Sequence, residues 1–313
     1  MNSLFLACTV VMPLMVYMAV GGLVRTLGIV TEASFKEINE MAFKVLIPLT
    51  LFFDIYGADW KIAINPGVFV FTILFIVVEF LVVKAIVVRF VKEKRDASTL
   101  IQGIFRSNYV LFGSTIGVPL CGPNGAALVA AMAAFMVPTV NILSVVLFET
   151  MRGGSVTFRD VIVRIFKNPL VDAGILGILF SFLKIPIPEL LATPLMKLGS
   201  AATPLALVTL GGLLSFQSMV SHKKYLLSAI AGRLVIVPVI IVTIAILAGF
   251  RGDALVVIFA VFASPTAVAS TPMAQSMGGN GALAGEIVAT SSLCSILTIF
   301  LFVVALSGMG FIG

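Results

Sequence analysis

The segment Ser264-Pro265-Thr266-Ala267-Val268-Ala269-Ser270-Thr271-Pro272 lies in the middle of an apolar run that extends from residue 254 to 277. Proline lacks a backbone N–H group and clashes with the preceding turn, so Pro265 and Pro272 should interrupt a helix here. Interrupted backbone at membrane depth is tolerated only where it is buried in protein or lines a wet cavity. The segment therefore predicts a broken helix beside a polar site.

The first half of the chain contains a comparable segment. The run 98–121 carries Ser107-Asn108 and then Gly113-Ser114-Thr115-Ile116-Gly117-Val118-Pro119. Interrupted helices at corresponding places in two halves of a transporter indicate a substrate site. The alternative is that proline and glycine only kink packed helices, while serine and threonine bond their own backbone.

The composition around these segments is that of an integral membrane protein. Of the 313 residues, 60% are hydrophobic and 11% are charged, whereas soluble domains carry about 25% charged residues. A membrane-spanning helix needs roughly 20 mainly apolar residues. We expect an all-α fold of ten such helices, at about 4–25, 38–57, 66–90, 98–121, 124–148, 168–184, 190–216, 224–249, 254–277 and 281–307.

Basic residues concentrate in the loops after the first, third, fifth and seventh of these runs, as Arg25, Lys92 and Arg152 illustrate. Because Lys and Arg stay on the cytoplasmic side, the sequence predicts a multi-pass protein of the cell membrane with both termini outside. The net charge of +6 then reflects how the protein is oriented in the lipid membrane, and no nucleic-acid partner is expected.

An offset of 156 residues aligns the chain with itself. Each half, 1–156 and 157–313, would hold five spans, an odd number, so the second half must enter the membrane upside down as an inverted repeat. The helix-breaking residues that match are Pro13 with Pro169, Pro48 with Pro204, and Asn124-Gly125-Ala126 with Asn280-Gly281-Ala282.

Neutral polar groups surround both expected breaks. Free N–H groups at the start of a half-helix, together with the helix dipole, attract a carboxylate. Hydroxyls and amides hold an anion without placing a permanent charge in the membrane. We expect Pro265 and Gly113 to shape the breaks and the donors to be Asn108, Ser114, Thr115, Asn141, Ser264, Thr266, Ser270 and Thr271.

Ionisable residues inside spans are functional candidates because they are costly there. Glu79 is a candidate for proton coupling, unless it pairs with Lys84. Arg106 and Arg233 lie about two turns from the cytoplasmic side, where their side chains can extend to water. Arg106 also stands near Asn108 and is placed to attract an anion.

Several classes of chemistry are not expected. One histidine and three cysteines provide no Cys/His metal cluster. The spans contain no nucleophile, base and orienting acid in a recognisable set, so the sequence does not indicate an enzyme, and no cofactor is expected.

The chain resembles the auxin efflux carrier family over nearly its whole length. The resemblance rests on the segments Asn168-Pro169-Leu170, Ile185-Pro186-Ile187-Pro188, Gly199 to Leu207, Phe105-Arg106-Ser107-Asn108, Val137-Pro138 with Asn141, and Ser264-Pro265. Thr115 stands where the family usually has the proline of a Gly-x-Pro in the fourth helix.

This resemblance implies a ten-helix transporter fold related to bile-acid sodium symporters, in which the fourth and ninth helices cross at their breaks. It implies a scaffold of the first, second, sixth and seventh helices, through which a homodimer can form, and elevator-type transport. The short loop between the fifth and sixth helices is similar to that of bacterial malate and malonate permeases. The implied substrate is a small organic anion, a mono- or dicarboxylate or an auxin-like acid; the alternatives are a sodium- or proton-coupled symporter, or a sensor or channel.

Overall fold

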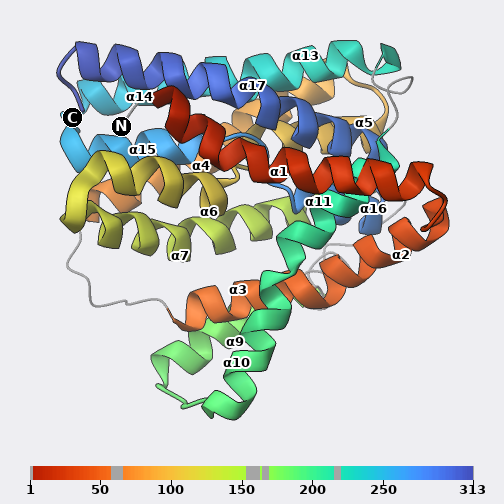
Figure 1. Ribbon diagram of the computed structural model, residues 1–313. Coiled ribbons are helices and arrows are strands. Elements are labelled where there is room, and N and C mark those ends of the chain that lie inside the picture. The colour runs from red at the N-terminus through yellow and green to blue at the C-terminus, as the bar shows by residue number, and fades with distance from the viewer. Residues whose placement is uncertain (1–2, 58–65, 153–162, 164–168, 215–219, 313) are drawn as a thin grey trace.

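The computed structural model describes residues 3–57, 66–152, 163, 169–214 and 220–312. All the regular elements in these ranges are helices (Figure 1). Those of the first half are α1 (Ser3–Thr26), α2 (Glu32–Met41), η1 (Ala42–Leu46), α3 (Ile47–Tyr56), α4 (Pro66–Phe90), α5 (Lys94–Phe105), α6 (Tyr109–Phe112), η2 (Gly113–Gly117) and α7 (Val118–Met151).

The second half contains a similar series of helices. They are α9 (Pro169–Phe182), α10 (Glu189–Ser200), α11 (Ala202–Leu213), α13 (Lys223–Ala231), η3 (Gly232–Ile236), α14 (Val237–Leu247), α15 (Gly252–Ala263), α16 (Ser270–Ser276) and α17 (Gly281–Gly308).

The three η elements are π-helical turns with one local cause. Each ends two residues before a proline: Pro48 follows η1, Pro119 follows η2 and Pro238 follows η3. A proline removes one backbone donor and clashes with the carbonyl four residues earlier, and a π turn widens the helix at that point. The helix therefore continues through each proline.

Among the residues that the structure describes, five helical segments are long and apolar enough to cross a membrane: Pro66–Phe90, Ala131–Met151, Glu189–Leu213, Lys223–Leu247 and Gly281–Gly308. Shorter apolar helices lie at Met15–Thr26, Pro169–Phe182 and Gly252–Ala263. The all-helical fold is thus confirmed over the described ranges, and its apolar helices are consistent with a membrane protein, while the ten-helix inverted repeat stays a prediction. The expected boundary between residues 156 and 157 lies outside the described residues.

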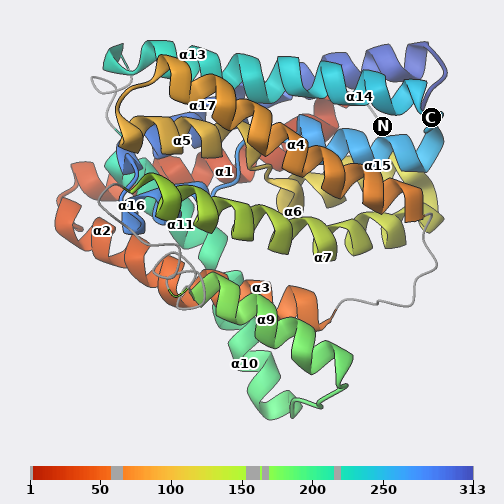
Figure 2. The same cartoon turned by 180° about the vertical axis from the view of Figure 1, so that it is seen from behind.

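The two halves of the chain pack together through close helix contacts. A Cβ atom on Gly21 of α1 would lie 1.9 Å from the carbonyl oxygen of Val208 in α11, and one on Gly211 would lie 1.9 Å from that of Met18. Only glycine permits this approach. Helices α3 and α9 meet in a similar way at Gly177, and with α10 they form a group at one edge of the molecule (Figures 1 and 2).

The remaining helices surround α5 and α15. Both are buried over most of their length, from Ala97 to Phe105 in α5 and from Leu255 to Ala263 in α15. The Tyr109 hydroxyl of α6 donates to the carbonyl of Val129 in α7 at 3.0 Å and so ties the short helix after the first break to α7. Helix α7 also packs against α5.

Candidate functional site

The two interrupted helices meet at their breaks. Helix α5 ends at Phe105 and the chain is extended at Arg106, while α15 ends at Ala263 and the chain is extended at Ser264. Ser107 and Thr266 form an isolated antiparallel β-bridge.

Two backbone hydrogen bonds hold this junction: Asn108 N–H donates to the carbonyl of Pro265 at 2.8 Å, and Ala267 N–H donates to that of Arg106 at 3.0 Å. Each break thus satisfies the backbone groups that the other leaves without a helical partner.

The first break lies earlier than the Gly113–Pro119 segment indicated. That segment stays helical: Gly113 begins the π turn η2, and a Cβ atom there would lie 2.7 Å from the Tyr109 ring. Gly113 therefore allows the aromatic ring to pack on the half-helix, five residues beyond Asn108. The side chains of Ser114 and Thr115 lie outside the described part of the structure.

A cavity of about 110 Å³ lies against the junction. Its lining brings together residues from the first break, the second break, α7, α3 and α11. They are Ile47, Thr50, Leu51, Asp54, Arg106, Ser107, Asn108, Val137, Val140, Asn141, Ala202, Thr203, Ala267, Val268 and Ala269.

Arg106 places a buried positive charge at this cavity. Its side chain does not extend to water, since the residue is only 3% exposed. Its guanidinium donates to Asn141 Oδ1 at 2.5 Å and to Met273 Sδ at 3.0 Å, and its Nε has no partner. Within the described ranges no carboxylate forms an ion pair with Arg106. The cation therefore has no fixed counter-charge there.

Two neutral groups beside Arg106 are also without partners. The hydroxyl of Ser107 and the amide nitrogen of Asn108 are buried and make no hydrogen bond in the described structure. Together with Arg106 they line the same cavity. We call Arg106, Ser107 and Asn108 the donor cluster. Burying polar atoms without partners is costly, so the donor cluster is suited to accept an anionic ligand.

The hydroxyls of the second break are already engaged. Ser264 Oγ donates to the carbonyl of Ala260 at 2.5 Å, and Thr266 Oγ1 donates to that of Gly103 at 2.6 Å. Both residues are fully buried, and neither lines the cavity. With Pro265, whose carbonyl accepts from Asn108, they hold the junction together rather than face a ligand.

Ser270 and Thr271 begin α16, and their hydroxyls are buried without partners. Thr271 lines a second cavity of about 310 Å³, together with Glu32, Lys36, Arg95, Gln275 and Glu286. Ser270 lines neither of these two cavities. The structure thus divides the expected donors between two places.

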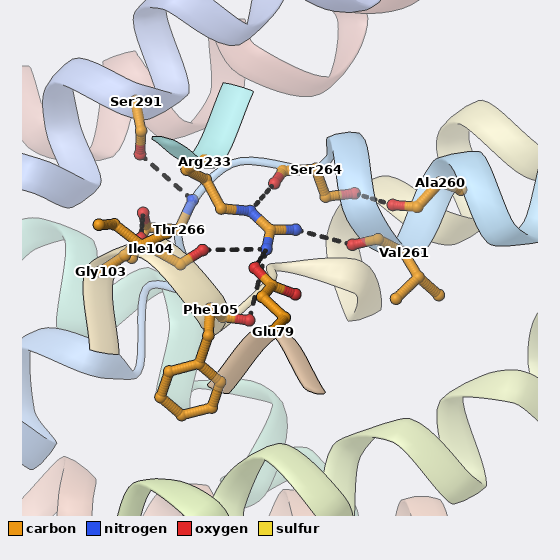
Figure 3. A network of polar contacts seen from close by, with 10 residues as sticks. All are labelled: Glu79, Gly103, Ile104, Phe105, Arg233, Ala260, Val261, Ser264, Thr266 and Ser291. Atoms are coloured by element: carbon orange, nitrogen blue, oxygen red, sulfur yellow. Dashed lines mark hydrogen bonds and ion pairs between the residues drawn. The ribbon is translucent and has the colours of Figure 1, made fainter. Parts of the chain in front are cut away.

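Glu79 lies apart from the cavity, in a polar network around Arg233 (Figure 3). Its carboxylate is 3.4 Å from Arg233 Nη1, whereas Lys84, the partner that the sequence offered, lies over the Phe80 ring at 5.8 Å. Arg233 is 0% exposed, so the expectation that it extends to water is wrong.

Arg233 joins the carboxyl ends of both half-helices. Its guanidinium donates to four carbonyls: Ile104 at 3.1 Å and Phe105 at 3.3 Å in α5, Val261 at 2.7 Å in α15, and Ser264 at 2.7 Å just after it. Carbonyls in the last turn of a helix lack helical partners, and a cation there is favourable. One side chain therefore stabilises both breaks.

Sequence reasoning did not identify the cavity wall formed by Thr50, Asp54 and Thr203. The signal for Asp54 was present, because it is an ionisable residue inside the expected span 38–57. It stands close to the end of that span, where a charged residue is less costly than at the centre and so is a weaker sign of function. Thr50 and Thr203 carried no distinguishing pattern.

A family model described as "Membrane transport protein" matches residues 155–303, which include α15, α16 and most of α17. A search of curated proteins found no match.

Proposed function

We propose that this chain, which belongs to the auxin efflux carrier family of membrane transport proteins, carries a small organic anion across the cell membrane as a secondary or facilitative transporter. That it is a multi-pass membrane protein follows from the family and from its long apolar helices. The anionic substrate, the site and the mechanism are inferred from the geometry at the junction of the two breaks.

The observation that carries the proposal is the buried guanidinium of Arg106 at the cavity, which has no carboxylate partner among the described residues. A buried charge is tolerated when it is paired. Arg106 is 3% exposed and forms no ion pair with a carboxylate in the described part of the chain. A guanidinium binds a carboxylate through parallel N–H···O bonds. A ligand carboxylate would therefore supply the missing counter-charge, and Ser107 and Asn108 would complete its hydrogen bonds.

The substrate class is a small mono- or dicarboxylate, such as malate or malonate, or an auxin-like acid. The cavity of about 110 Å³ favours the smaller members of this class. The short connection between the fifth and sixth expected helices, which resembles that of bacterial permeases, points the same way.

The mechanism that we propose is elevator-type alternating access. Helices α1, α2, α3, α9, α10 and α11 would form the static scaffold, through which two copies could pair in the lipid bilayer. The unit that contains α5, α7, α15 and α16 would carry the donor cluster past it. The glycine contacts of α1 with α11 support a rigid scaffold. Both termini would lie outside the cell, as the distribution of basic residues predicts.

A proton- or sodium-coupled symporter and a sensor or channel remain alternatives. The position of Glu79 weakens proton coupling through that residue, because Glu79 contacts Arg233 rather than the cavity. Uptake into proteoliposomes with and without a sodium or proton gradient separates the coupled from the uncoupled transporter. Counterflow excludes a channel, since a channel does not exchange labelled for unlabelled solute against a gradient.

The test of the proposed function compares Arg106→Gln with Arg251→Gln. Arg251 is exposed at the start of α15, so its change removes the same charge away from the cavity. Proteoliposomes loaded with unlabelled malate, malonate, lactate or alanine are assayed for uptake of the same labelled compound. We expect saturable counterflow for at least one compound in the wild type and in Arg251→Gln, and at least a tenfold loss in Arg106→Gln. Equal counterflow in all three proteins would reject the site.

A further inference from the structure

The cavity has two chemically different walls. One wall is the donor cluster, which follows α5 and in which Arg106 is 3% exposed. The other is part of α3 and includes Asp54, which is exposed and therefore stands nearer the rim of the cavity than Arg106 does. In the described part of the chain Asp54, like Arg106, forms no ion pair. The cavity therefore presents one open positive group and one open negative group.

Thr50 adds to the acceptor character of the α3 wall. Its hydroxyl donates to the carbonyl of Gly199 at 2.7 Å and lies 3.1 Å from that of Leu46. A hydroxyl has one proton to donate. Because that proton is engaged with backbone carbonyls, Thr50 can only accept a hydrogen bond from a ligand. Asp54, when ionised, is also an acceptor only.

We propose that Asp54 determines which anions this transporter accepts. The two walls fit a small carboxylate with a single negative charge, whose other end donates a hydrogen bond from a hydroxyl or an ammonium group. The carboxylate would bind the donor cluster and the donor would face Asp54 and Thr50. A dianion would place its second carboxylate near Asp54. Repulsion between these two negative charges would weaken binding of the dianion relative to that of a monoanion.

This inference rests on the proposed function and narrows its substrate class to monocarboxylates, so that dicarboxylates such as malate and malonate become poor substrates. A cavity of about 110 Å³ leaves little room for a second carboxylate to avoid Asp54. Replacing Asp54 with asparagine removes the repulsion and adds an amide donor to this wall. The preference for monoanions over dianions should therefore fall in this variant, even if the overall rate of transport also changes.

Four compounds of related structure test the inference. Lactate carries a carboxylate and a hydroxyl, and malate is lactate with a second carboxylate on its methyl group. Propionate is lactate without the hydroxyl. Alanine is lactate with an ammonium group in place of the hydroxyl. Lactate and alanine distinguish the two kinds of donor, propionate tests whether a donor is needed, and malate tests the exclusion of a dianion.

The experiment measures kcat/KM for each compound in proteoliposomes containing the wild type, Asp54→Asn or Glu189→Gln. Glu189 is an exposed carboxylate in the first turn of α10 and does not line the cavity, so it is a matched control. We expect the wild type and Glu189→Gln to prefer lactate or alanine to malate by at least tenfold, and lactate or alanine to propionate. Asp54→Asn should reduce the preference over malate at least tenfold.

Each result has a defined meaning. A preference over malate that stays within twofold in Asp54→Asn overturns the role of Asp54, and a wild type that transports propionate as well as lactate overturns the need for a donor. If the wild type transports none of the four compounds but does transport malonate or an auxin-like acid, the inference about Asp54 is overturned and the proposed function stands; transport of none of these compounds contradicts the proposed function itself. If Asp54→Asn does not fold, Asp54→Ser and competition of malate against labelled lactate in the wild type give the same discrimination.

Discussion

Arg233 Nη1 lies 3.4 Å from Glu79 Oε1 in the buried interior, and the same guanidinium donates to carbonyls at the carboxyl ends of α5 and α15. The arginine therefore contributes more than its ion pair: it holds two half-helices at the spacing that the junction needs.

Arg233→Ala should destabilise the protein strongly, because it leaves the Glu79 carboxylate and four carbonyls without their donor. Removing one partner of a buried pair costs about 3–5 kcal/mol. Glu79→Gln should cost less, since an amide oxygen still accepts from Arg233. Thermal unfolding in detergent measures both, and an Arg233→Ala variant as stable as the wild type would remove this role for the arginine.

Asn108→Ala and Asn141→Ala should both impair transport but differ in stability. The amide nitrogen of Asn108 has no partner in the described structure, so its loss removes a donor for the ligand at little cost to folding. Asn141 accepts from Arg106, so its loss leaves a buried guanidinium less satisfied. Such a loss costs about 1–3 kcal/mol.

Thermal unfolding and counterflow on the same preparations separate the two effects. The expected pattern is unchanged stability with impaired transport for Asn108→Ala, and loss of both for Asn141→Ala. Unimpaired counterflow in both variants would contradict the proposed site.

Gly21→Ala should disrupt the contact between α1 and α11, because its methyl group would lie 1.9 Å from a backbone oxygen. Overpacking of this kind costs typically 1–3 kcal/mol. Gly22→Ala is the neighbouring control, since its methyl group would lie 3.7 Å from the Gly211 carbonyl oxygen, an ordinary contact. A lower unfolding temperature for Gly21→Ala alone is the expected result; equal values would argue against a tight interface.

Asn39 of α2 and Gln275 of α16 connect the expected scaffold and moving unit. Asn39 Nδ2 donates to Gln275 Oε1 at 2.5 Å, and Thr209 of α11 donates to Asn39 Oδ1 at 3.2 Å. If α16 moves past α2 during transport, this contact must break in each cycle.

Cross-linking tests that movement. In a protein whose native cysteines are replaced by alanine, Asn39→Cys with Gln275→Cys should react with a short bifunctional thiol reagent and lose counterflow, while either single variant should keep it. Full counterflow after complete cross-linking would rule out relative motion of these helices.

The place of the second break could be predicted from sequence, because Pro265 lies in an apolar run and proline has few other roles there. The place of the first break was harder to predict. Gly113 and Pro119 have the residue types of a break, but a π turn accommodates the proline and keeps the segment helical. A helix breaks where the freed backbone groups find other partners, and the Arg106 carbonyl and the Asn108 N–H find theirs at Ala267 and Pro265, in the second half of the chain.

Arg233 illustrates a second limit. Its depth along one helix indicated a side chain that reaches water, whereas its partners come from α4, α5 and α15. Such a convergence appears only when the helices are packed. The charge of Asp54 was visible in the sequence, but its place beside Arg106 was not, since the two residues share a cavity only through segments that are distant in the sequence.

The bridge between Ser107 and Thr266 has a consequence for biogenesis. The ribosome completes residue 107 long before residue 266, so α5 enters the bilayer with the backbone after it unpaired, and unpaired backbone groups are expensive in lipid. The first half therefore reaches its fully hydrogen-bonded arrangement only after α15 has been inserted. A chain terminated before α15 should be degraded by quality-control proteases, even though each of its apolar segments has been inserted into the bilayer.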